Sequence, residues 1–95
     1  MNIEEHVKII KTKMLLANIP LQDLVREPMG IAPLARSILK LEPEIDKEIF
    51  IRVALKLWRD VKYDLDSPGY FAHKREVLED VYTAYRIQRS VSEES

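Results

Sequence analysis

The sequence contains no cysteine, only two glycines and only two histidines. Without cysteine there is no disulfide, no thiolate metal site and no thiol nucleophile. The isolated residues Gly30 and Gly69 cannot form the glycine-rich loop that cradles a phosphate. Ser37 and Ser67, the serines that precede the C-terminal residues, have simple roles as a surface residue and a helix cap. We therefore expect no catalytic site and no cofactor.

The chain also lacks an excess of charge of either sign and a long apolar run. Its 15 basic and 16 acidic residues give a formal net charge of −1. A strong overall attraction to nucleic acid or to anionic lipid is therefore not expected. No apolar run approaches the roughly 20 residues that a transmembrane helix needs. Glu4 and Glu5 stand where a secretory signal would carry basic residues, and we expect a cytoplasmic protein.

Apolar and charged residues are present in the proportions of a folded protein, at 46% and 33% of the chain. A length of 95 residues suits one domain, since two would each fall below the size at which a core becomes reliable. The last six residues, Ser-Val-Ser-Glu-Glu-Ser, are mostly polar. We expect a single helical domain over residues 1–89 and a polar C-terminal tail over residues 90–95.

Five prolines divide the sequence into segments that have the apolar spacing of helices: Pro20, Pro28, Pro33, Pro43 and Pro68. Because proline has a fixed φ and no amide hydrogen, it occupies the first turn of a helix or ends the previous one. The segments predict helices over residues 3–19, 20–27, 33–41, 43–65 and 68–88. Asn18 is expected to cap the second helix and Ser67 the last, and Gly30 is expected in a turn.

These segments predict an all-α fold, a small helical bundle of four to five helices. The two long helices at the C-terminal end are separated by a short loop, which predicts a long antiparallel pair. The short proline-delimited helices in the middle are too short to be stable alone. We expect them to be held by packing against the long helices.

Two of the predicted helices carry more apolar surface than one helix face holds. In residues 3–19, Ile9 and Leu16 form a second stripe about 120° from the main one. In residues 43–65, the apolar side chains cover an arc of more than about 200°, whereas a surface helix needs only about 100°. The longer segment is therefore either the central helix of the monomer or the seam of an oligomer.

This surplus of apolar surface predicts a non-enzymatic protein–protein interaction module, or a small regulatory or adaptor protein, that self-associates. A homodimer is the favoured assembly. Ile9 and Leu16 are the candidate interface residues on the first helix. Tyr82 and Tyr85 are further candidates, because tyrosine combines an apolar ring with a polar tip and is common at interfaces.

The alternative is a small nucleic-acid-binding regulator that uses a basic strip on the long helix. Arg52, Lys56, Arg59 and Lys62 follow one another at spacings of four, three and three residues. This spacing places a row of cations on one helix face, where they could meet successive phosphates. Acidic residues border the same strip, as they would on an ordinary solvated face. A helix-turn-helix interpretation of residues 24–39 fails, because Arg36 stands where the second helix needs an apolar residue.

A metal site has little support. His73, Glu76 and Asp80 share one face of the last predicted helix and are suitable ligand types. Helical bundles build such sites from several helices, however, and an outward-facing polar surface explains these residues as well. We expect no metal.

Overall fold

The computed structural model describes residues 2–25, 30–62 and 68–94, with the backbone alone at positions 62, 68–71 and 92–94. These ranges contain the helices α1 (Ile3–Leu16), α2 (Leu21–Leu24), α3 (Ala32–Leu41), α4 (Lys47–Lys62) and α5 (Pro68–Glu94). No strand occurs in the described ranges, which confirms the predicted all-α fold. Gly30 precedes α3 with a φ of +70°, a conformation that glycine adopts without strain. Pro28 and Ser67 lie outside the described residues.

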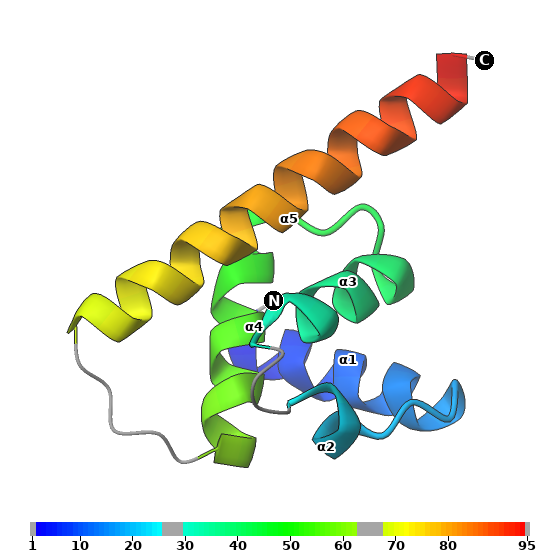
Figure 1. Cartoon of the computed structure of the whole chain (residues 1–95). Coiled ribbons are helices and arrows are strands. Elements are labelled where there is room, and N and C mark those ends of the chain that lie inside the picture. The colour runs from blue at the N-terminus through cyan, green and yellow to red at the C-terminus, as the bar shows by residue number, and fades with distance from the viewer. Residues whose placement is uncertain (1, 26–29, 63–67, 95) are drawn as a thin grey trace.

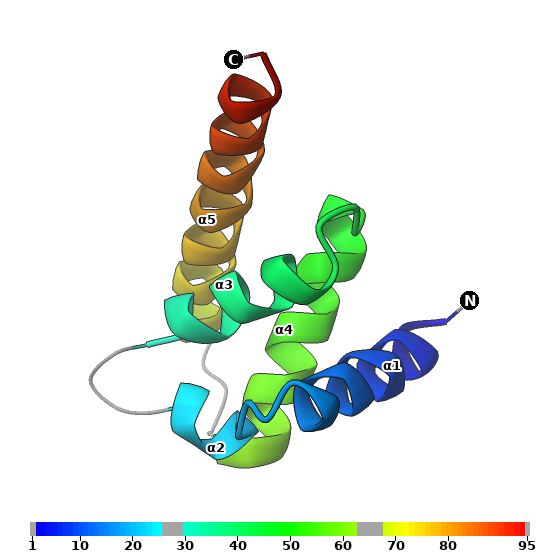
Figure 2. The ribbon, with the colours of Figure 1, turned by 90° about the vertical axis from the view of Figure 1, so that its right-hand side faces the viewer.

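Helix α4 occupies the centre of the molecule, and α1, α3 and α5 all pack against it. Helix α1 lies on one side, α5 lies on the other, and α3 sits between them across α4 (Figures 1 and 2). The predicted antiparallel pairing of the two long helices is not confirmed. Helix α5 crosses α4 obliquely and packs against α3 as well, and its C-terminal end reaches beyond the other helices (Figure 1).

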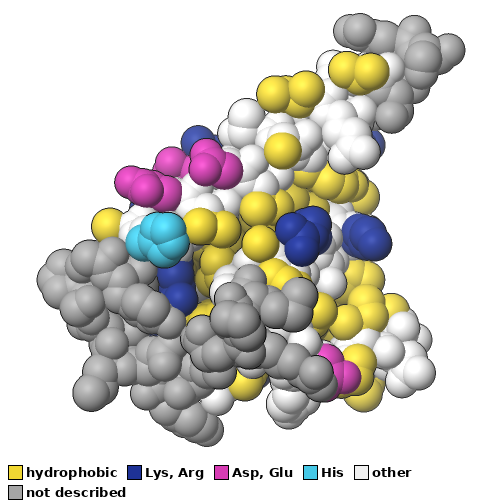
Figure 3. Space-filling model, viewed as in Figure 1, with side chains coloured by type: hydrophobic (Ala, Val, Ile, Leu, Met, Phe, Trp, Pro, Cys, Tyr) yellow, Lys and Arg dark blue, Asp and Glu magenta, His cyan; other side chains and the backbone are white. Residues whose placement is uncertain are grey.

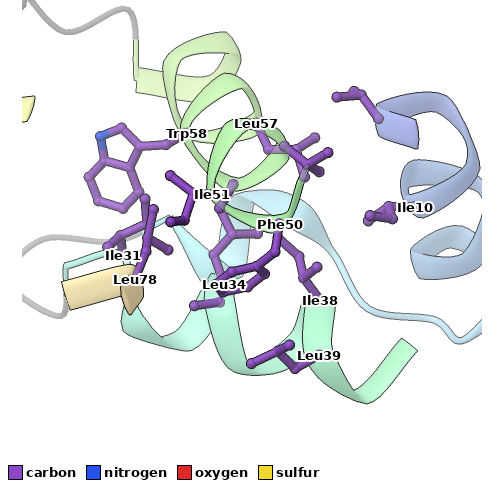
Figure 4. Packing of buried hydrophobic residues seen from close by; sticks show 14 of the residues in the cluster. Ile10, Ile31, Leu34, Ile38, Leu39, Phe50, Ile51, Leu57, Trp58 and Leu78 are labelled. Carbon is purple, nitrogen blue, oxygen red and sulfur yellow. The ribbon is translucent and has the colours of Figure 1, made fainter. Parts of the chain in front are cut away.

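The core is built around one face of α4 and the residues that converge on it. The side chains of α4 that are at most 1% exposed are Phe50, Ile51, Val53, Ala54, Leu57 and Trp58. Phe50 lies against Leu34 of α3, and Leu78 of α5 lies beside Trp58 (Figure 4). Ile10 of α1 approaches α4 from the opposite side. Helix α4 is therefore the central helix of the monomer, and its wide apolar arc is largely covered within one chain.

A buried lysine joins α5 to this core. Lys74 is only 6% exposed, and its ammonium group lies 4.2 Å from the centre of the Trp58 ring. A cation over an indole face is attracted by the negative charge of the ring face. The contact allows a charged side chain to lie in the apolar junction between α4 and α5.

The start of α4 differs from the prediction, because Pro43 does not open the helix. The chain makes a turn after α3, and α4 begins at Lys47. One carboxylate oxygen of Asp46 accepts hydrogen bonds from the amides of Glu48 (3.1 Å) and Ile49 (3.4 Å). This side chain satisfies amides that have no partner within the helix, so the helix begins where the cap is.

The last helix is longer than predicted. Helix α5 has 27 residues and continues to Glu94, beyond the expected end at Gln88. At about 1.5 Å per residue it spans roughly 40 Å. Residues 90–94, which we expected to form a tail, are the last turns of this helix.

The end of α1 also corrects the sequence interpretation, because Asn18 ends this helix and does not cap the next. Asn18 has a φ of 59°, in the left-handed region that Asn tolerates better than most residues. Its amide donates to the carbonyl of Leu15 (3.1 Å), and the amide of Ile19 donates to that of Met14 (2.9 Å). These two bonds form a Schellman motif, which turns the chain sharply from α1 towards α2.

Candidate interaction surfaces

Large apolar side chains remain exposed at two places in the described chain. On α1 they are Ile9, Leu15 and Leu16, at 37%, 80% and 82% exposure, and on α5 they are Ile87 and Val91, both at 60%. We call Leu15, Leu16 and the adjoining groove the α1-end surface. We call Ala84, Ile87 and Val91 the α5 outer stripe.

The α1-end surface results from the helix register and from the turn that follows. Val7, Ile10 and Met14 form the buried face of α1, and Leu15 and Leu16 fall outside it because successive residues are 100° apart. The Schellman turn then directs the chain away, and Leu15 and Leu16 stay largely exposed. Leu15, but not Leu16, is among the described residues that line an open groove of about 470 Å³. Its described lining consists of Lys11, Met14, Leu15, Asn18, Ile19, Pro20, Leu21 and Gln22, and the only charge among them is on Lys11.

Charges of both signs lie around this groove. Lys8, Lys11 and Lys13 precede the leucines, and Asp23 directly follows the lining residue Gln22. Lys11 forms an ion pair with Asp60 of α4 at 3.7 Å, and Lys13 forms a close one with Glu42. Both pairs are substantially exposed and therefore weak. The α1-end surface is thus apolar at its centre, and two of the three lysines on the adjoining turns of α1 are paired with acids.

The α5 outer stripe lies on the side of α5 that faces away from the body. Ala84, Ile87 and Val91 are spaced by three and four residues, so they align along one face of the helix. On a helical wheel this face lies roughly opposite Leu78, which is fully buried against the core. Glu76 and Asp80 share the outer face one to two turns earlier. Figure 3 shows hydrophobic side chains along the far part of α5 and acidic ones nearer its start.

The inner face of α5 is fixed to the segment between α3 and α4. The hydroxyl of Tyr82 donates to the carbonyl of Ile45 (2.9 Å), and its ring lies 5.4 Å from that of Phe50, centre to centre. Arg86 donates to the same carbonyl (3.1 Å) and to the Tyr82 hydroxyl oxygen (2.8 Å). These contacts hold the middle of α5 in place.

One turn later, Arg89 donates to the carbonyl of Pro43 (3.1 Å) and to the carboxylate of Glu44. Arg86 also forms an ion pair with Glu44, at 3.6 Å. The hydrogen bond and charge of Arg89, with a smaller contribution from Arg86, lower the pKa of Glu44 below its ordinary value. Both arginines therefore point towards the body, and neither adds a positive charge to the outer face.

The four interface residues expected from the sequence fall into two groups. Ile9 and Leu16 share the outer face of α1, as their spacing of seven residues predicts. Tyr82 and Tyr85 are partly buried against the core, on the inner face of α5. Figures 1 and 2 place α1 and α5 on different sides of the molecule, so the two groups do not form one site.

Leu15, Ile87 and Val91 were not among the candidates, although they are among the most exposed apolar side chains. The helical wheel could have identified Leu15, because this residue lies outside the main apolar stripe of α1. Val91 was missed because the last helix was predicted to end at Gln88.

The basic strip of the alternative interpretation lies on the outward side of α4. Arg52 is exposed and forms a long ion pair with Glu48 (4.0 Å), which also pairs closely with Arg75 of α5. Arg59 is exposed and Lys56 is partly buried. The side chain of Lys62 is outside the described part of the structure. An acid in contact with two arginines reduces the positive potential of this face, and nucleic-acid binding stays a prediction.

Within residues 2–25, 30–62 and 68–94, no three His, Asp or Glu side chains are arranged to hold a metal ion, including His73, Glu76 and Asp80. None of the helices in those ranges combines the length and apolar character that spanning a bilayer requires. No protein-family model, no curated protein and no solved structure matches this chain.

Proposed function

We propose that this chain is a non-enzymatic protein-interaction module that associates with further copies of itself, the smallest assembly being a dimer. The observation that carries the proposal is the exposure of Leu15 and Leu16, 80% and 82%, together with the apolar groove that Leu15 lines. The core of the monomer is otherwise well covered, with ten large side chains less than 2% exposed. Contiguous apolar surface left outside a complete core is typical of interaction sites. The cytoplasmic location expected from the sequence is part of the same proposal.

The free energy that two buried leucines can contribute indicates how strong the self-association should be. Covering a leucine side chain fully contributes about 1.5–3 kcal/mol. Association itself costs at least about 4 kcal/mol in lost translational and rotational freedom. Two leucines thus offset little more than this cost, and the contact needs apolar side chains from the partner as well. We therefore expect reversible association, measurable between about 10 µM and about 1 mM.

Sedimentation equilibrium across this concentration range tests the proposal. The variant Leu15→Gln/Leu16→Gln keeps residues that favour a helix but removes the apolar surface. We expect the wild-type chain to associate and this variant to stay monomeric, with unchanged helix content by circular dichroism. The matched control is Arg36→Gln/Lys40→Gln, two exposed positions four residues apart on α3, which should associate like the wild type. A wild-type chain that sediments as a monomer at about 1 mM would contradict self-association.

A further inference from the structure

Helix α5 is held to the rest of the molecule in two different ways along its length. Its first half is anchored in the core through two buried side chains, Lys74 beside Trp58 and Leu78. After Leu78, no described side chain of α5 is buried. From Tyr82 onward, polar side chains of α5 reach residues 43–45, in the turn between α3 and α4. The second half of α5 is therefore held largely by polar contacts with one turn.

These polar contacts converge from one face of α5 on a short stretch of chain. The residues that form them are Pro43, Glu44, Ile45, Tyr82, Arg86 and Arg89, and we call the set the α5 clasp. Its three donors are spaced by four and three residues, so they lie along one side of the helix. Two backbone carbonyls accept from them, at 2.9 Å to 3.1 Å, and the carboxylate of Glu44 pairs with both arginines of the set. The α5 clasp thus joins two segments that lie 37 to 46 positions apart in the sequence.

The turn depends on α5 as much as α5 depends on the turn. Residues 43–45 lie outside both helices, so their carbonyls have no regular helical partner. The carbonyls of Pro43 and Ile45 instead accept from side chains of α5. If those side chains move away, both oxygens lose these partners, and the loss of a partly buried partner costs free energy. Opening on one side should therefore release the other side as well.

The α5 clasp is weaker than the anchor in the core. The side chains of Arg86, Arg89 and Glu44 are 37%, 32% and 75% exposed, and ion pairs between groups as exposed as these contribute little. Leu78, by contrast, is fully buried, and moving it would expose apolar surface. Segments held by exposed polar contacts open at a lower free energy than segments held in a core. The second half of α5 should thus open before the first.

We propose that residues 82–90 of α5 and the turn at residues 43–45 open and close as one unit while the core stays folded. The closed clasp fixes the direction in which the far end of α5 projects beyond the other helices (Figure 1). The open clasp releases that direction, and with it the position of Ile87 and Val91. The α5 clasp is thus a conformational device within one chain, and it does not depend on self-association.

Native-state hydrogen exchange followed by NMR, at urea concentrations below the unfolding transition, tests this proposal. A helix segment without packing is only marginally stable in water, so its amides exchange whenever the clasp is open. In the wild type, the amides of residues 84–90, the clasp amides, should share one protection factor. It should be at least about tenfold lower than that of residues 74–78, the core amides, which are released only when the core unfolds. The amide of Ile45, which donates to the carbonyl of Glu42 (3.2 Å), should exchange with the clasp amides.

Two matched variants separate the clasp from the core. Arg86→Gln/Arg89→Gln removes the charged donors and keeps residues that favour a helix. It should lower the protection of the clasp amides and of Ile45 by the same factor, about fivefold. Ile10→Val weakens a buried contact of α1 with α4, which stays intact when the clasp opens. It should lower the protection of the core amides by about threefold and leave the clasp amides unchanged.

Four results would overturn the proposal. If the core and clasp amides share one protection factor in the wild type, α5 opens as a whole. If protection falls steadily towards the end of α5 and the arginine variant does not change it, the helix end only frays. If that variant affects the clasp amides but not Ile45, the two segments are not one unit. If Ile10→Val lowers the protection of both sets of amides equally, the clasp opens only with the core. Glu44→Gln repeats the experiment if the arginine variant loses helix content.

Discussion

Helices α4 and α5 both carry abundant apolar residues, yet the fold covers them differently. Helix α4 is contacted by α1, α3 and α5, and six of its side chains are at most 1% exposed. Helix α5 is packed on its inner face, whereas Ile87 and Val91 on its outer side are 60% exposed. The wide apolar arc of α4 therefore identified the helix that the monomer covers best. The exposed large apolar side chains of the described chain lie instead on α1 and α5, outside the buried face of each helix.

The difference also separates stability from interaction. Residues of α4 meet several helices, so their loss leaves a cavity that the fold cannot close. Residues of the α5 outer stripe contact solvent in the monomer, so their loss alters little until a partner is present. Substitutions in the two helices should accordingly affect different measurements.

The largest expected effect on stability comes from truncation of Phe50. Its side chain is fully buried on α4 and contacts the ring of Tyr82. Phe50→Ala should lower the free energy of unfolding by about 3–5 kcal/mol, because it removes buried surface and leaves a cavity. Urea denaturation followed by circular dichroism measures the change.

The matched substitution on α5 is Ile87→Ala. It should change the free energy of unfolding by no more than about 0.5 kcal/mol, as is usual for exposed positions. If Ile87→Ala destabilises the monomer as much as Phe50→Ala does, the outer stripe is part of the monomer's core. The contrast between α4 and α5 would then be wrong.

A smaller effect is expected where α5 is fixed to the segment between α3 and α4. Tyr82→Phe keeps the ring beside Phe50 but removes the hydroxyl that donates to the carbonyl of Ile45. The loss of this partly buried hydrogen bond should cost about 0.5–1.5 kcal/mol. Thermal denaturation monitored at several urea concentrations measures it.

Tyr85→Phe is the control for this prediction. Tyr85 is also partly buried on the inner face of α5, but its hydroxyl forms no hydrogen bond within the described chain. This substitution should leave the stability nearly unchanged. Equal effects of the two substitutions would mean that the hydroxyl of Tyr82 does not hold α5 in place.

Much of the fold could be predicted from local sequence signals. The apolar spacing in α1 identified Val7, Ile10 and Met14, all of which are buried. Pro33 marked the start of α3 to within one residue. Such signals suffice because a helix with one apolar face both forms and packs in a way that its own residues determine.

Predictions failed where a local signal had two possible meanings. Pro43 could start a helix or lie in a turn, and the capping carboxylate of Asp46 decided for the turn. Asn18 could cap the start of one helix or end another, and its positive φ shows that it ends α1. The hydrogen bond from the Tyr82 hydroxyl to the carbonyl of Ile45 joins residues 37 positions apart, and no local pattern contains it. A role of Tyr82 at an interface stays a prediction.

The smallest expected effect concerns pH and Glu44, the acid that pairs with Arg86 and Arg89 of α5. Arg89 and Arg86 lower the pKa of Glu44 in the folded chain. Glu44 therefore stabilises the fold at pH values above its ordinary pKa of about 4.3. This contribution is lost as the pH falls through the lower pKa of the folded state, because the carboxylate is then protonated in both states.

Wild type should be more stable than Glu44→Gln at pH 7, and the difference should shrink progressively below about pH 4. Thermal denaturation of both proteins from pH 7 to pH 3 measures this. Glu44 is exposed, so the change should be smaller than that of Tyr82→Phe. A difference that persists unchanged at pH 3 would mean that Glu44 acts through a contact other than its ion pairs with α5.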